Sequence, residues 1–289
     1  MNRAGFHLWS LGRLKEAQGP FERLLALNIE LKNYRHAAIN SNNLIALLLV
    51  RGELQTALQR SNDAVDFIDR TEDKDWQSAS RAQLANVLAI QGKMQETRAL
   101  FEEAEQRQKL AHPNQPYLYS MRGFDYTSFL LRAAPPSELP GLAERVQASL
   151  KIVTRLLSIA LDTLNLARIA ALTGDQTAAA QFDAAIAALR KAGSRDHIPR
   201  GYLARAGFRR AEGDLAGAWD DLAEVRHIAE PSGMRLFLCD SLIEEAWLHH
   251  LSGDAKEARA AFKQAAAEVN AMGYHRQDEE LDKLCQALD

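Results

Sequence analysis

The residues that could do chemistry are dispersed along this chain of 289 residues. The eight histidines are scattered, and the adjacent His249 and His250 would point to different sides of a helix. We find no P-loop, no H-E-x-x-H, no paired C-x-x-C and no G-x-S-x-G motif. The carboxylates follow the polar faces that helices present to solvent. The sequence therefore predicts no enzyme, no metal site and no cofactor.

One local excess of positive charge stands out between positions 190 and 210, where only Asp196 opposes seven bases. These bases are Arg190, Lys191, Arg195, Arg200, Arg205, Arg209 and Arg210. Guanidinium groups bind carboxylate and phosphate well, so this basic run could attract an acidic peptide, a phosphate or RNA. The alternative, which we favour, is that it pairs with acids of neighbouring helices, such as Glu212, Asp214, Asp220 and Asp221.

The composition of the whole chain makes nucleic acid and membranes less favoured as partners. The formal net charge is only −3, so no global field favours nucleic acid or a membrane. The bases are not interleaved with aromatic residues, as they are in nucleic-acid stacking platforms. The longest apolar stretch, Leu44 to Val50, is too short to span a bilayer, and the N-terminus has no signal-peptide pattern. Cys239 and Cys285 are interpreted as buried free thiols, which together with these features predicts a cytoplasmic protein.

The elements that must position these residues are set by a repeat. Glycines recur at steps of 40, 40, 82, 39 and 40 residues, at positions Gly12, Gly52, Gly92, Gly174, Gly213 and Gly253. One unit is therefore repeated about seven times, and the fourth copy has lost its glycine. A period of this size indicates stacked helical units.

Each unit is predicted to consist of a first helix (helix A), a glycine turn and a second helix (helix B). Small residues follow the glycine after five positions at Ala17, Ala57, Thr97, Ala218 and Ala258. A bulky residue often comes four positions later, as in Phe21, Phe101, Leu222 and Phe262, and the fifth unit has Ala178 and Phe182. Glycine fits the turn because ending helix A requires a left-handed residue.

This pattern resembles the tetratricopeptide repeat, a helix–turn–helix unit with a glycine in helix A followed by A-x3-F. The resemblance covers essentially the whole chain, although this unit has about 40 residues instead of 34 and mostly lacks the closing proline. The segments 196–236, 273–281 and 119–126 further resemble arrays found in bacterial proteins associated with signalling NTPases. The family implies an all-α, right-handed α-solenoid of about seven helix pairs, with an open concave groove that binds partners.

We expect one superhelical domain over 1–289 with a C-terminal capping helix. The units are predicted at about 1–33, 34–75, 76–112, 113–155, 156–195, 196–234 and 235–273, and the cap at 274–289. The cap has an apolar stripe formed by Leu281, Leu284, Cys285 and Leu288. The first helix lacks such a cap, which suggests that this end docks on another subunit or that the chain is the distal part of a longer protein.

The resemblance also places candidate partner-binding residues on the concave surface. They are Asn42, Asn86, Arg168, Arg200, Arg210, Asp240 and Trp247. The two asparagines would hydrogen-bond the backbone of a partner, or they are simply solvated.

The fourth unit is unusual because five aromatic residues fall within thirteen positions, at Tyr117, Tyr119, Phe124, Tyr126 and Phe129. The interpretation we favour is a bulky core beside a distorted turn at 133–141. The alternative is a ligand pocket containing Tyr119 and Tyr126. The sequence thus predicts a non-enzymatic module that binds a protein or peptide, with a small-ligand sensor as the alternative and nucleic acid as the weaker third.

Overall fold

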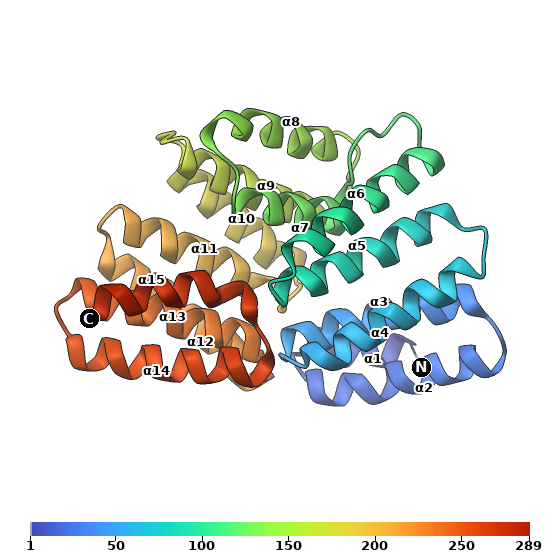
Figure 1. Ribbon diagram of the computed structural model, residues 1–289, viewed down its shortest axis with the longest axis horizontal. Coiled ribbons are helices and arrows are strands. Elements are labelled where there is room, and N and C mark those ends of the chain that lie inside the picture. The colour runs from blue at the N-terminus through green and yellow to red at the C-terminus, as the bar shows by residue number, and fades with distance from the viewer. Residues whose placement is uncertain (1) are drawn as a thin grey trace.

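The computed structural model describes residues 2–289, and no strand occurs within that range. Seven helix pairs follow one another: α1 (Asn2–Ser10) with α2 (Leu14–Glu30), α3 (Tyr34–Val50) with α4 (Leu54–Asp69), α5 (Lys74–Ile90) with α6 (Met94–Ala111), α7 (Ser120–Leu131) with α8 (Leu139–Leu150), α9 (Leu156–Leu172) with α10 (Ala178–Ala192), α11 (Ile198–Ala211) with α12 (Leu215–Ser232), and α13 (Arg235–Leu251) with α14 (Ala255–Met272). The capping helix α15 (Asp278–Leu288) completes an all-α solenoid, as the sequence predicts (Figure 1). Two short 3₁₀ helices, η1 (Pro136–Glu138) and η2 (His275–Gln277), precede α8 and α15. None of the helices in the described range combines the length and apolar character needed to cross a bilayer.

The glycine turn works as the repeat predicts. Gly52 ends α3 with φ of 75°, a left-handed conformation that other residues adopt only at a cost. Its N–H donates to the carbonyl of Leu49 at 3.0 Å, and the N–H of Glu53 donates to Leu48 at 2.9 Å. These two bonds satisfy carbonyl groups that the helix end leaves free. The other five repeat glycines have φ between 68° and 82°, so the six bends are equivalent.

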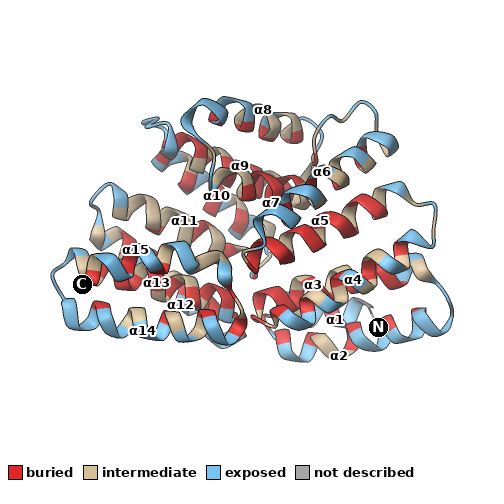
Figure 2. Cartoon of the chain, viewed as in Figure 1, coloured by how far each residue is buried: buried red, intermediate tan, exposed pale blue. Residues whose placement is uncertain are grey.

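The small and bulky residues after each glycine form the core between the paired helices. Ala17, Ala57 and Ala218 are fully buried, and so are Phe21 and Phe101. The A helices α3, α5, α9 and α13 are buried along much of their length, while the outer faces of α2 and α14 are exposed (Figure 2). Phe262 is only partly buried, because the short α15 is all that follows the last helix pair.

The solenoid curls until its last repeats contact its first ones. Helix α13 contacts α3, and η2 contacts α5 (Figure 1). The turn at Gly52 lies against Met272 and Arg235, and the turn at Gly92 lies against His275. The prediction of an open groove along the whole stack was therefore wrong in extent, since the C-terminal repeat and turn meet α3, α5 and the glycine turns that end them.

The C-terminal cap differs from expectation at Cys285, whereas the N-terminal helix agrees with it. Cys239 is buried as predicted, but Cys285 is exposed. In α15 the buried stripe consists of Leu281, Leu284 and Leu288 only, because Cys285 lies past the edge of the face that meets α14 and α13. Helix α1 has 9 residues where α3 has 17, as the short N-terminal unit implies.

Candidate functional site

The inner side of the curl contains a groove with a volume of about 630 Å³. Helices α7, α9, α11 and α13 contribute its walls together with Phe182 of α10, and η2 with α15 closes one side. Phe182, Leu203, Phe208 and Ile243 supply apolar surface. Its charged lining includes Arg168, Arg210, Asp240, Glu244, Arg276 and Glu280. This mixture of an apolar wall with a few convergent polar groups is typical of ligand sites.

An ordered polar cluster forms the end of the groove near Trp247. Arg210 donates from Nε to Glu244 at 2.7 Å, across from α11 to α13. The guanidinium carbon of Arg210 is 5.2 Å from the centre of the Trp247 ring, and Trp247 donates from Nε1 to Glu280 at 2.9 Å. Burial raises the pKa of Glu244 despite the attraction of Arg210, and the negative charges of Glu280 and Asp240 add to the rise.

Asp240 anchors the C-terminal turn to the middle of the groove. The hydroxyl of Tyr274 donates to Asp240 at 2.8 Å, and the amide of Gln277 donates to it at 2.5 Å. Arg276 lies 4.0 Å from the other carboxylate oxygen of Asp240 and donates to the Tyr274 hydroxyl. Burial raises the pKa of Tyr274, so the phenol stays a neutral donor to Asp240 at ordinary pH.

The opposite end of the groove is formed by α7, α9 and the start of α11. Arg168 donates from Nη1 to Ser128 and Asn165, both at 3.2 Å. Burial lowers the pKa of Arg168 to about 10, and the positive charges of Arg200 and Arg276 contribute to the decrease. Arg200 lies between the rings of Phe124 and Phe237, at 5.8 Å and 5.5 Å from their centres. We call this region the Phe124 end.

The residues proposed from the sequence fall into two groups. Arg168, Arg210 and Asp240 line the groove. Arg200 adjoins it at the Phe124 end, and Trp247 adjoins it through Arg210 and Glu280.

The two asparagines lie elsewhere. Asn42 is on α3 and donates to Ser80 of α5 at 3.2 Å, while its buried side-chain oxygen has no partner in residues 2–289. Asn86 is half-buried on α5. Neither is among the residues that line the groove.

The two tyrosines of the fourth unit that were candidates for a ligand pocket lie in different environments. Tyr126 is 5% exposed and stacks on Phe101 with ring centres 4.6 Å apart. Tyr119 is half-buried, and Arg122 lies over its ring at 5.2 Å. Neither residue lines the groove. This placement favours the core interpretation for Tyr126.

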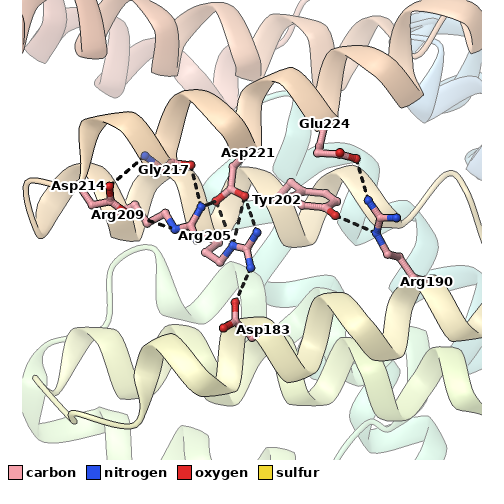
Figure 3. A network of polar contacts seen from close by, with 9 residues as sticks. All are labelled: Asp183, Arg190, Tyr202, Arg205, Arg209, Asp214, Gly217, Asp221 and Glu224. Atoms are coloured by element: carbon pink, nitrogen blue, oxygen red, sulfur yellow. Dashed lines mark hydrogen bonds and ion pairs between the residues drawn. The ribbon is translucent and has the colours of Figure 1, made fainter.

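Three of the seven bases of the basic run pair with acids of α10 and α12 (Figure 3). Arg190 pairs with Glu224 at 2.7 Å. Arg205 pairs with Asp183 and with the buried Asp221, and Arg209 contacts Asp221 at 3.2 Å. Of the four acids expected from the sequence, Asp214 and Asp221 make such pairs, whereas Glu212 and Asp220 make none within the described range.

Several groove residues were not anticipated, above all Arg276, Gln277 and Glu280 of the C-terminal turn and cap. The sequence predicts this segment to be a terminal cap outside an open groove. The available signals were the resemblance carried by 273–281 and the density of charged and amide side chains, which a cap shares with any solvated helix end.

A scan against protein-family models gives no match, and a search of curated proteins gives none either. Among solved structures, a tetratricopeptide repeat protein from Parabacteroides merdae is similar with a TM-score of 0.53 and 14% identity, over 99% of this chain and 96% of that one. A Rap protein complexed with competence and sporulation factor is similar with a TM-score of 0.57 and 14% identity, over 95% of this chain and 80% of that one. At this identity the likeness shows the fold alone, which is a solenoid of the tetratricopeptide type.

Proposed function

We propose that this chain, a solenoid of the tetratricopeptide type, is a non-enzymatic regulator that binds a peptide or protein segment in its inner groove. The observation that carries the proposal is the groove itself, where helices of four successive repeats present apolar walls and ordered charged groups to one space. Its volume of about 630 Å³ suits a short segment better than a folded domain.

The Rap structure supports this assignment, because that solenoid was crystallised with competence and sporulation factor. We extend the analogy to a role in bacterial signalling in the cytoplasm, in keeping with the expectation from the sequence. The proposed contact residues are Arg168, Arg200, Arg210, Asp240 and Trp247. Asn42 and Asn86 remain candidates for a longer partner, and the exposed face of α1 remains a candidate for self-association.

The proposal is tested by filling the groove. Gly207 is in α11 and lines the groove, and the nearest atom to a side chain added there is Glu244 Oε1 at 3.5 Å, an ordinary contact. Gly207→Leu should therefore fold and project its side chain into the ligand space. Gly141→Leu is the matched control, because Gly141 is also helical and has no atom within 4 Å of an added Cβ.

The measurement is retention of pooled synthetic short peptides on the immobilised full chain, with bound peptides identified by mass spectrometry. Wild type and Gly141→Leu should retain the same peptides, and Gly207→Leu should lose them by about tenfold or more, which corresponds to about 1.4 kcal/mol. Equal retention by Gly207→Leu would remove the groove from the proposal. Release of a small non-peptide ligand from the purified protein, with no peptide retained, would favour the small-ligand sensor instead.

A further inference from the structure

The contact that closes the curl joins two different kinds of edge, and we call this contact the seam. Gly12, in the turn after α1, lies against Ser232, the last residue of α12. Gly52, in the turn after α3, lies against Met272, the last residue of α14. In both cases the turn that follows a helix A packs on the end of a helix B, and the two contacts follow the same order along the chain.

Both kinds of edge continue beyond the seam, where they are uncovered. The turns after α9, α11 and α13 form a free A-turn edge, because a Cβ added at Gly174, Gly213 or Gly253 would meet no described atom within 4 Å. The ends of α2, α4 and α6 form a free B-end edge. Figure 1 shows the turns after α11 and α13 on the left and the ends of α2 and α4 on the right. The molecule therefore presents the two halves of its own seam on opposite sides.

The end of α2 has the same backbone as the end of α14 in the seam. Lys32 and Gly273 have φ of 53° and 72°, and in each turn the next N–H donates to a carbonyl five positions back, at 2.8 Å and 2.9 Å. Leu31 and Met272 directly precede these residues and so occupy equivalent positions. Met272 lies against Gly52 and is 4% exposed, whereas Leu31 is 66% exposed. Leu31 thus has the geometry of a seam residue without the cover of a seam.

The two free edges have apolar side chains at the same intervals. Leu31 and Leu110 are two repeats apart on the B-end edge, and Leu172 and Leu251 have the same separation on the A-turn edge. All four are among the five most exposed large apolar side chains of residues 2–289. Single exposed leucines are ordinary, but two equally spaced pairs on edges of opposite kind suit an edge-to-edge contact.

The middle position of each edge is charged, and the signs are opposite. Arg70 follows α4, is exposed and makes no ion pair within residues 2–289. Glu212 and Asp214 flank the turn after α11, and both are exposed. The order of contacts in the seam would place Arg70 beside these two acids when each leucine pair meets the other. Glu72 is also exposed near Arg70, so this position contributes less than the leucines.

We propose that the chain binds further copies of itself, with the B-end edge of one copy docked on the A-turn edge of the next. The partner is a second copy because the chain itself supplies the edge that covers such turns in the seam, and the new contact continues that one. An interface between two different edges is heterologous, so the assembly grows head to tail. This inference goes beyond the proposed function and does not depend on a ligand in the groove.

The test uses two complementary variants of the full chain. Leu31→Asp combined with Leu110→Asp damages only the B-end edge, and Leu251→Asp damages only the A-turn edge. None of these three residues lines the groove, whereas Leu172 does and is left unchanged. Sedimentation velocity over a range of concentrations should show wild type forming species larger than the 32.1 kDa monomer. Each variant should associate about tenfold or more weakly, as expected for loss of central apolar contacts.

An equimolar mixture of the two variants is the decisive measurement. One variant keeps its A-turn edge and the other keeps its B-end edge, so the mixture should form a 1:1 dimer and nothing larger. An interface that used the same surface on both copies would not give this result.

Leu11→Asp is the matched control and should associate as wild type does. Leu11 has the same exposure of 51% as Leu251, but it adjoins the Gly12 turn that Ser232 already covers. Circular dichroism melting verifies the fold of each variant. Wild type that stays monomeric up to about 1 mM would overturn the proposal, and so would a variant mixture without dimer. Association lost only in Leu11→Asp would assign the interface to α1 instead. Peptide retention by the groove is measured separately, so these outcomes leave the proposed function intact.

Discussion

Arg132, which directly follows α7, donates a hydrogen bond at 2.6 Å from Nη2 to the backbone carbonyl of Arg276, which lies 144 positions further along the chain. This bond joins the fourth repeat to the C-terminal turn. Together with the contacts of Gly52 and Gly92, it makes the two ends of the solenoid neighbours. The groove exists in its observed form because of this curl, since Arg276, Gln277 and Glu280 reach it only from the C-terminal turn and cap.

We expect Gly52→Ala to destabilise the chain more than Gly253→Ala. Both glycines have positive φ, so each substitution has a backbone cost of about 1–2 kcal/mol. A methyl group at Gly52 would also collide with the side chain of Met272, whereas Gly253 has open space around it. The excess should be about 1–3 kcal/mol in urea unfolding. Equal costs would contradict a tight contact between the Gly52 turn and Met272.

Replacing Asp162 with asparagine should stabilise the protein at neutral pH. Asp162 is 1% exposed and receives one hydrogen bond, from Ser149 at 2.6 Å. Burial raises the pKa of Asp162 to about 6, although the Ser149 hydrogen bond opposes the rise. The folded state therefore binds more protons than the unfolded state between about pH 4 and 6, and stability falls as pH rises through this window.

Above pH 6 the ionised Asp162 should cost the folded state about 2–3 kcal/mol. Unfolding of wild type and Asp162→Asn in urea at pH 4.5 and pH 8 measures the difference. The advantage of the variant should be larger at pH 8. A variant whose advantage does not change with pH would contradict the assigned protonation.

Phe101→Ala should cost about 3–5 kcal/mol of unfolding free energy, because Phe101 is fully buried against Tyr126 and Phe129. Tyr126→Phe keeps the stacked ring and should change stability by less than about 1 kcal/mol. Denaturant midpoints compare the two. A large cost for Tyr126→Phe would mean that its hydroxyl has a role the stacking does not explain.

Arg205→Gln should destabilise the fold by about 2–3 kcal/mol, because it leaves the buried Asp221 with Arg209 as its remaining partner (Figure 3). Arg190→Gln removes a pair whose two side chains are 52% and 43% exposed, and should cost less than about 1 kcal/mol. Thermal unfolding at low salt distinguishes them. Similar small effects would mean that Asp221 is solvated in solution.

The repeat was predictable because it depends on local chemistry. The bend at Gly52 requires a left-handed residue, and Ala57 and Phe101 pack within one helix pair or between neighbours. The predicted pattern does not include a second set of glycines that has the same period. Gly193, Gly233 and Gly273 end three successive B helices with φ between 65° and 72°.

The groove was only partly predictable. Arg168, Arg210 and Asp240 follow from the position of the A helices in the stack. The approach of Arg276 to Arg132 depends on small rotations between repeats that accumulate along the solenoid, and no residue encodes their sum. The pairing of Arg205 with Asp183 likewise bridges α10 and α11, so it requires the angle between two repeats.

The contact between α3 and α13 couples the unfolding of two repeats that are distant in sequence. Linear repeat arrays fray from their ends, since a terminal unit has one neighbour only. Here the second unit also touches the seventh, so releasing either one exposes surface on the other. Amide hydrogen exchange should therefore show protection of α3 and α13 rising and falling together, as in a single cooperative unit.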